Sequence, residues 1–148
     1  MDKIVVNTAF GHVKIEAEDQ KICRLDLTNE PTVSSSSPVL NQAANQIIRY
    51  FNGESIQFDL PLNPIGTTFQ RAVWQALTEI PFGETRSYQA IASTIGNIKA
   101  VRAVGGAVNK NPIMIVIPCH RVIGKDGSLV GFYGGLELKQ RLLDLEKR

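Results

Sequence analysis

One stretch predicts where the chemistry of this 148-residue chain lies: Ile113-Met114-Ile115-Val116-Ile117-Pro118-Cys119-His120-Arg121-Val122-Ile123-Gly124. Its five leading apolar residues predict a short buried extended segment. Pro118 ends that segment, because its ring fixes φ and it has no N–H to donate to a neighbouring strand. The thiol of Cys119 is then followed directly by an imidazole and a guanidinium. Neighbouring cations lower a thiol pKa, so this order predicts that Cys119 is a nucleophile.

A Cys-His pair alone is a weak signal. It is more often a small buried cysteine beside a surface histidine. The whole string Pro-Cys-His-Arg-Val is far rarer, and it favours the nucleophile.

Composition describes a soluble globular protein, with 43% hydrophobic and 20% charged residues. No apolar run approaches the ~18–20 residues that cross a bilayer, and no signal peptide opens the chain. The two cysteines, Cys23 and Cys119, show no CxxC spacing. They therefore argue against a disulfide framework or a thiolate zinc site and favour a reducing compartment. We expect a cytoplasmic protein without a membrane partner.

The net charge of +2 is unevenly divided. Residues 1–64 carry five Lys/Arg and eight Asp/Glu (5 − 8 = −3), whereas residues 65–148 carry eleven and six (11 − 6 = +5). No acid lies between Glu84 and Asp126, a span that holds six basic residues: Arg86, Lys99, Arg102, Lys110, Arg121 and Lys125. A basic, acid-free surface is typical of phosphate-backbone binding, although a solvated basic face is commoner.

Residues 1–64 are expected to form an α/β scaffold lobe. Alternation of apolar and polar residues predicts strands at 3–7, 13–17, 21–27 and 56–60, and a helical repeat predicts a helix at 39–51. Residues 28–38, rich in serine and proline, read as a flexible connector. Cys23 is expected in the core. A metal site built from Cys23 and His12 would lack further ligands.

Residues 65–148 are expected to form a second lobe of helices. A helix capped by Thr67 or Thr68 runs to Ile80, and a short helix from 87 to 95 and another from 97 or 98 to 109 flank Gly96. Two short helices around a glycine turn indicate a helix-turn-helix, or alternatively an ordinary corner between two core helices. A closing helix is expected at 136–147, with its leucines, Leu136 included, largely buried.

The helix at 97–109 has an unusual composition. Ala100, Ala103, Gly106 and Ala107 leave one side almost without side chains. Two adjacent glycines cost a helix roughly 1 kcal/mol each, which indicates close approach to something. A smooth helix with one projecting arginine, Arg102, suits a DNA minor groove and binding with little sequence preference.

The motif Pro118-Cys119-His120-Arg121-Val122 resembles the alkyl-acceptor motif of the O6-alkylguanine-DNA alkyltransferases, which are suicidal DNA repair proteins. The likeness extends from about residue 69 to 146. It implies that Cys119 accepts the alkyl group, that His120 activates the thiol through a water, and that Glu146 orients His120. It also implies that Tyr88 helps to rotate the nucleotide and donates a proton to the leaving guanine.

The resemblance further implies a DNA surface and a substrate pocket. Arg102 matches the arginine that fills the gap left by the flipped nucleotide, and Asn111 matches the hinge between recognition helix and acceptor segment. The other residues expected at DNA are Lys99, Ala103, Gly106, Ala107 and Arg121. Those expected at the pocket are Val122, Phe132, Tyr133 and Gly134. Gly131-Phe132-Tyr133-Gly134-Gly135 departs from the family's usual Gly-Tyr-x-Gly-Gly, which puts the pocket size in question.

The expectation is therefore an α/β (α+β) protein: an N-terminal strand-helix lobe, 1–64, and a C-terminal helix-turn-helix (winged-helix-like) lobe, 65–148. As a methylated-DNA–protein-cysteine methyltransferase, it would flip O6-alkylguanine out of double-stranded DNA and transfer the alkyl group irreversibly to Cys119. The resemblance implies no metal, nucleotide or redox cofactor, and a monomer. Two alternatives remain: a lesion sensor without catalysis, and a cysteine hydrolase using Cys119 and His120.

Overall fold

The computed structural model of the chain describes residues 1–128, 132 and 134–147, and the chain divides into two compact units. The first unit contains Met1–Ile65 and Pro112–Met114, and the second contains Gly66–Asn111 and Ile115–Arg148. The sequence predicts one boundary near residue 65, but it does not predict that Pro112–Met114 belong to the first unit. These three residues belong to the first unit because the carbonyl of Pro112 and the N–H of Met114 pair with the backbone of Leu25, at 3.0 and 3.2 Å.

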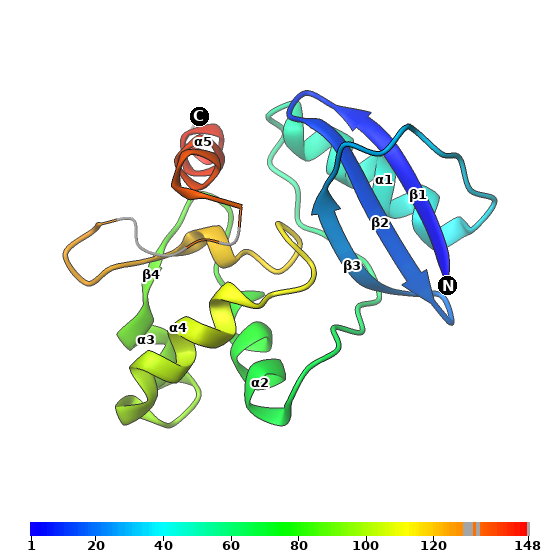
Figure 1. Ribbon diagram of the computed structural model, residues 1–148. Helices are drawn as coiled ribbons and strands as arrows, with labels where there is room; N and C mark the ends of the chain where they lie inside the picture. The colour runs from blue at the N-terminus through cyan, green and yellow to red at the C-terminus, as the bar shows by residue number, and fades with distance from the viewer. Residues whose placement is uncertain (129–131, 133, 148) are drawn as a thin grey trace. The chain divides into compact units, whose positions relative to one another are not determined.

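The first unit is a three-stranded antiparallel sheet with one helix packed on it (Figure 1). The strands β1 (Asp2–Thr8), β2 (Gly11–Glu18) and β3 (Lys21–Leu27) follow one another as a meander, and α1 (Pro38–Phe51) covers the sheet. These elements confirm the strands and the helix predicted from alternation and helical spacing. Cys23 is buried in this core, as expected.

Residues 56–60 do not form the predicted strand. Their side chains do alternate, since Ile56, Phe58 and Leu60 are half-buried while the residues between them are exposed. However, the free edge of β3 is occupied by the next segment: Ile22 donates to the carbonyl of Pro61 and accepts from Asn63, both at 2.8 Å. Residues 56–60 therefore show the alternating burial of a strand, but they do not pair with the edge of β3.

The serine-rich connector between β3 and α1 is attached to the sheet at two points. Val33 exchanges two backbone hydrogen bonds with Val5, each 3.0 Å. Glu30 pairs with Lys14 and Lys3, whose ammonium groups lie 2.5 and 3.1 Å from its carboxylate. The hydrogen bond from Lys14, followed by that from Lys3, lowers the pKa of Glu30 to about 2. The expectation of a flexible connector is thus wrong for its first half.

The second unit is mainly helical. Its elements are α2 (Thr68–Leu77), β4 (Arg86–Ser87), α3 (Tyr88–Thr94), η1 (Ile98–Ala100), α4 (Val101–Asn109), η2 (Cys119–Arg121), β5 (Val122–Ile123) and α5 (Leu136–Glu146). Sequence fixes the helix starts: Thr67 and Gln70 form a capping box on α2, and the Ser87 hydroxyl accepts the N–H of Ala90 at 3.0 Å. Gly96, with φ of 80°, ends the turn after α3.

Helices α2, α3 and α4 pack against one another, as expected for a helix-turn-helix lobe (Figure 1). The closing helix α5 is also present, but Leu136 at its start is 48% exposed, contrary to the prediction that its leucines are buried. None of the described helices is long and apolar enough to cross a membrane.

The apolar segment before Cys119 is buried throughout, as predicted, but it is not a straight strand. Residues 115 and 116 form a turn, and Ile115 has a φ of 76°. A β-branched residue rarely adopts a positive φ, so this turn carries backbone strain. The segment therefore turns before Cys119 and does not run straight, as a single strand would.

Candidate active site

Cys119, His120 and Arg121 form a single 3-10 turn, and all three are buried. Pro118 precedes the turn, and its carbonyl accepts the N–H of Arg121 at 3.0 Å. Directly after the turn, β5 pairs in parallel with β4, register Arg86↔Val122 and Ser87↔Ile123. This pairing places the turn Cys119–Arg121 beside the residues that begin α3 at Tyr88.

The carboxylate of Glu146 is the centre of a buried polar cluster. Its Oε2 lies 2.5 Å from Nε2 of His120. Arg121 donates from Nε to Oε1 at 2.8 Å and from Nη2 to Oε2 at 3.1 Å, and the N–H of Gly83 donates to Oε1 at 3.2 Å. The side chains of His120 and Glu146 are 0% and 1% exposed. The structure thus joins two of the predicted catalytic residues, which lie 26 positions apart.

Arg121 was predicted to face DNA, and that prediction is wrong. Its guanidinium is buried, paired with Glu146, and donates from Nη1 to the carbonyl of Ile80 at 2.7 Å. It also lies over the ring of Phe82, with Cζ 5.8 Å from the centroid. A guanidinium that is buried and bonded through all three of its nitrogens inside the protein is not placed to bind a phosphate outside it.

The thiol pKa moves in the opposite direction from the sequence expectation. Burial raises the pKa of Cys119 to about 11, and the side chain of Asn111 and the charge of Lys139 only partly oppose this. The expected lowering fails because complete burial disfavours the thiolate more than the nearby cations favour it. Burial likewise lowers the pKa of His120, against the opposing effect of Glu146, so the imidazole is neutral at physiological pH.

Lys139 is a site residue that sequence reasoning missed. It is fully buried, and its Nζ lies 5.9 Å from the centroid of the Tyr88 ring. Burial lowers the pKa of Lys139, and the charge of Cys119 opposes that effect. Helical spacing offered a signal: positions 139, 142, 143 and 146 follow an i, i+3, i+4, i+7 pattern and are all buried.

Tyr88 and Asn111 lie at the two ends of the helix pair α3–α4. Tyr88 is half-buried, and burial raises the pKa of its hydroxyl. A Cβ at Gly105 of α4 would lie 4.0 Å from Cδ1 of Tyr88. Asn111 is buried just after α4, and its side-chain amide donates to the carbonyl of Ile117 at 2.7 Å. This hydrogen bond spans the turn that leads to Cys119.

The predicted recognition helix exposes part of its smooth side. Lys99, Arg102, Ala103 and Gly106 are exposed, and a Cβ at Gly106 would meet no atom of the described protein within 4 Å. Internal packing therefore does not require that glycine. Ala107 is different: it is only 3% exposed, so its side chain belongs to the core and not to the DNA surface. The predicted contact of Ala107 with DNA is therefore wrong.

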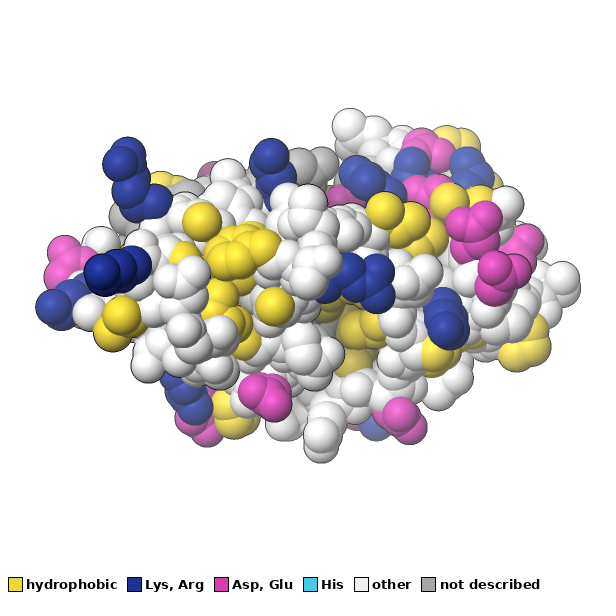
Figure 2. Space-filling view, turned by 90° about the horizontal axis from the view of Figure 1, so that it is seen from below, with side chains coloured by type: hydrophobic (Ala, Val, Ile, Leu, Met, Phe, Trp, Pro, Cys, Tyr) yellow, Lys and Arg dark blue, Asp and Glu magenta, His cyan; other side chains and the backbone are white. Residues whose placement is uncertain are grey.

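Fewer basic residues are available at this surface than the sequence suggested. Of the six basic residues between Glu84 and Asp126, Arg121 is internal and Arg86 pairs with Glu84 at 3.1 Å. The four exposed ones are Lys99, Arg102, Lys110 and Lys125. Figure 2, seen from below the view of Figure 1, shows Lys and Arg side chains spread over this face, several of them beside Asp or Glu, with uncharged and hydrophobic side chains between them.

The expected substrate pocket is only partly described. Val122 is buried, Phe132 is half-buried and Gly134 is exposed, whereas Tyr133 and residues 129–131 lie outside the described residues. The effect of Tyr133 on pocket size therefore stays a prediction.

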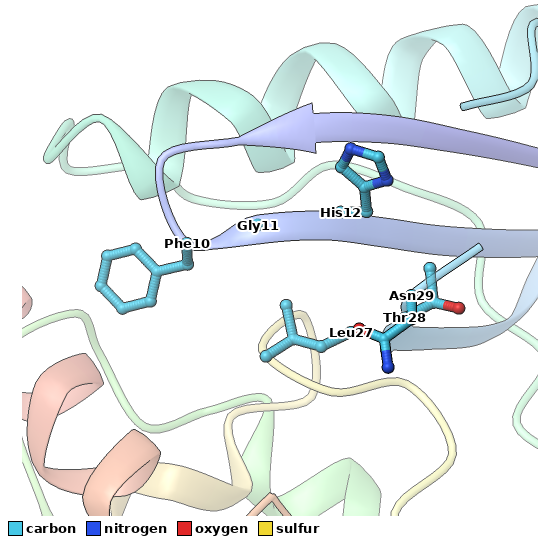
Figure 3. Close-up of a pocket in the computed structure, with 6 residues that line it drawn as sticks. All are labelled: Phe10, Gly11, His12, Leu27, Thr28 and Asn29. Carbon is cyan, nitrogen blue, oxygen red and sulfur yellow. The ribbon is translucent and has the colours of Figure 1, made fainter. Parts of the chain in front are cut away.

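A separate hollow of about 520 Å³ lies on the first unit (Figure 3). It is lined by Phe10, Gly11, His12, Leu27, Thr28 and Asn29. His12 makes a 2.8 Å contact from Nδ1 to the carbonyl of Glu30, and the lining contains neither thiol nor carboxylate. Within the described part of the chain, no group of three or more His, Cys, Asp and Glu could hold a metal ion.

Two family models cover almost the whole chain. "6-O-methylguanine DNA methyltransferase, DNA binding domain" matches residues 68–148, and the ribonuclease-like domain of the same family matches residues 1–64. A methylated-DNA–protein-cysteine methyltransferase of Haemophilus influenzae is 48% identical over 145 residues, covering 93% of this chain and 81% of that relative. The constitutive one of Bacillus subtilis is 44% identical over 151 residues, with 95% and 92% covered.

Solved structures agree with these sequence matches. The crystal structure of Mycobacterium tuberculosis OGT in complex with DNA superposes with a TM-score of 0.87 at 41% identity, covering 98% of this chain and 92% of that one. The fold class predicted from the sequence, an α/β N-terminal lobe followed by a helical lobe, is confirmed by this similarity.

Proposed function

The chain belongs to the 6-O-methylguanine DNA methyltransferase family, and we propose on this premise that it repairs DNA by direct reversal. In the proposed reaction, the alkyl group of an O6-alkylguanine moves to Sγ of Cys119. The observation that carries the proposal is the buried turn Cys119–Arg121, whose histidine contacts the carboxylate of Glu146. The product is a thioether, which the protein has no means of hydrolysing, so each molecule acts once.

The first step is removal of the thiol proton. With a pKa of about 11, only about one Cys119 thiol in ten thousand is ionised at neutral pH, so the resting acceptor is protected and needs a base. His120 is suited to this task because its lowered pKa keeps it neutral. Nε2 contacts Glu146, so the proton would reach Nδ1, through a water as the resemblance implies.

The second step is an in-line displacement at carbon. The thiolate attacks the alkyl carbon, the S–C bond forms, and the C–O6 bond breaks with its electron pair moving onto the guanine. The leaving base then takes up a proton, for which we propose the hydroxyl of Tyr88. Atoms and charge balance without an external oxidant, reductant or cofactor.

Reaching a base inside a duplex requires that it be flipped out. We propose that α4 and the preceding η1 bind the minor groove, with little sequence preference, through Arg102, Ala103 and Gly106 on α4 and Lys99 on η1. These four residues are exposed, and only Arg102 and Lys99 among them have long side chains, which supports the proposal. We also propose that the protein acts in the cytoplasm as a monomer; its two free cysteines, Cys23 and Cys119, agree with a reducing compartment.

The test is mass spectrometry after incubation with excess O6-methylguanine duplex. We expect one adduct of about 14 Da on Cys119 and then no further reaction. Cys119→Ser should abolish the adduct, and Cys23→Ser, the matched control at the other thiol, should not. Sustained turnover would favour a cysteine hydrolase, and tight lesion binding without an adduct would favour a sensor.

A further inference from the structure

We propose that Arg121 is a positioning residue of the transfer reaction, which keeps the neighbouring imidazole neutral by neutralising Glu146. This inference rests on the proposed function, because it concerns how His120 is prepared to accept the Cys119 proton. It also gives Arg121 a role that differs from the DNA contact expected from the sequence.

The contact between Arg121 and Glu146 is bidentate and buried. Nε and Nη2 each donate to a different carboxylate oxygen, at 2.8 and 3.1 Å, and the two side chains are 8% and 1% exposed. A fork of this kind fixes the plane of the carboxylate as well as its charge. The third nitrogen, Nη1, donates to the carbonyl of Ile80 at 2.7 Å, so each of the three guanidinium nitrogens has a partner within the unit.

The two carboxylate oxygens of Glu146 have different sets of hydrogen-bond partners. Oε1 accepts from Arg121 Nε and from the N–H of Gly83, and Oε2 faces His120 Nε2 and Arg121 Nη2. A carboxylate that accepts several hydrogen bonds is held in its charged form. Glu146 is thereby fixed as an anion with one oxygen directed at the imidazole.

An unneutralised buried carboxylate beside His120 would favour the imidazolium, which cannot accept a proton. The guanidinium makes the Arg121–Glu146 pair neutral, so protonating His120 would leave an uncompensated charge in the interior. Burial is the largest cause of the lowered pKa of His120. Among the charged groups that face the ring, Glu146 raises this pKa, whereas Arg121 from the same turn and Lys139 from α5 lower it. The thiol of Cys119 adjoins it, and the contacts from the connection after α2 are uncharged: the carbonyl of Ile80, the N–H of Gly83 and the ring of Phe82.

The test is an NMR titration of the two imidazoles in the whole, unmodified protein. The chain has only two histidines, so His12, on the other unit, is an internal reference for folding and pH. Arg121→Met, which removes the charge, should raise the His120 midpoint by about one pH unit, a tenfold change in proton affinity, without moving His12. Arg121→Lys keeps the positive charge but cannot make two parallel hydrogen bonds to Glu146. In this variant the His120 midpoint should lie close to its wild-type value.

A second comparison covers the case in which Arg121→Met does not fold. Arg121→Gln removes the charge but keeps an amide donor, and it should raise the His120 midpoint in the same direction as Arg121→Met. In the Glu146→Gln background no carboxylate charge is left to neutralise, so adding Arg121→Gln should move the midpoint much less. An equal shift in both backgrounds, or an unmoved His120 in folded Arg121→Met or Arg121→Gln, would overturn the proposal.

Transfer kinetics give an independent readout. With free O6-benzylguanine, the acid limb of the pH–rate profile should move to higher pH in Arg121→Met by the same amount as the imidazole midpoint. A purely structural role would lower the rate at every pH without moving the limb. If wild-type protein transfers nothing, the proposed function fails, while the titration still decides the role of Arg121.

Discussion

The indole N–H of Trp74 donates a hydrogen bond to the carbonyl oxygen of Ala107, 2.8 Å away, in the interior of the second unit. Trp74 lies on α2, and Ala107 lies near the end of α4, 33 residues further along the chain. The bond satisfies the polar atom of a buried tryptophan and a carbonyl in the last turn of the proposed recognition helix. It therefore ties the position of that helix to the core of its unit.

Trp74→Phe should destabilise the protein by about 1–3 kcal/mol, because it removes the donor to Ala107 and leaves part of the indole volume empty. The measurement is urea unfolding followed by circular dichroism. Gln75→Ala, at the exposed neighbouring position of α2, is the matched control and should change stability by less than about 0.5 kcal/mol. A Trp74 variant as stable as that control would show that the bond contributes nothing.

Arg102→Ala should impair repair of duplex DNA far more than benzyl transfer from free O6-benzylguanine. Arg102 is exposed on α4, so we expect it to act in extruding the base, a step that costs a few kcal/mol in lost stacking. Arg49→Ala, which removes the same charge from an exposed position on the first unit, serves as the control. An equal loss with both substrates would instead assign Arg102 to the chemistry or the fold.

Duplex affinity should fall steeply as salt concentration rises and should depend little on sequence, because phosphate contacts release counterions. Fluorescence anisotropy with labelled duplexes of different sequence at several salt concentrations measures both effects. Arg102→Ala and Lys99→Ala should each make the salt dependence shallower by about one phosphate contact. A salt dependence unchanged in both variants would place the DNA surface elsewhere.

Stability should depend on pH through the acceptor thiol. The pKa of Cys119 is raised from 9.0 to about 11 in the folded state, so between these values the unfolded chain has lost a proton that the folded protein keeps. The free energy of unfolding should therefore be unaffected by this thiol below about pH 9 and fall above it, by up to ~2–3 kcal/mol. The difference between wild type and Cys119→Ser, measured by urea unfolding from pH 7 to 11, isolates this component. Parallel curves would contradict the raised pKa.

Alkylation should lower the melting temperature. Cys119 is only 3% exposed, so an added methyl group finds little free volume, and overpacking typically costs ~1–3 kcal/mol. We expect the strain to appear in residues 98–112, where Asn111 connects the end of α4 to the acceptor turn. Thermal melts and amide exchange of unmodified, methylated and benzylated protein would measure it, with larger groups acting more strongly. A raised or constant melting temperature would show that the pocket already has room.

Much of the secondary structure and the family could be predicted from local sequence. Alternating residues located β1 to β3, and Thr67 and Ser87 marked the starts of α2 and α3 through hydrogen bonds within one turn. The string from Pro118 to Val122 identified the family, which the matches confirm. These features were predictable because they depend on neighbouring residues alone. The strand at 56–60 failed because a strand also needs a partner, and the residues that follow it occupy the available edge.

What only the tertiary structure decided is the electrostatic state of the site. No spacing rule brings Arg121 and Glu146 together across 25 residues, or places Lys139 beside Tyr88. The direction of the Cys119 pKa was wrong for the same reason. Sequence shows which charges stand next to the thiol, but the cost of removing the thiolate from water depends on everything packed around it. Residue identity therefore determined which atoms can react, and burial determined their protonation states.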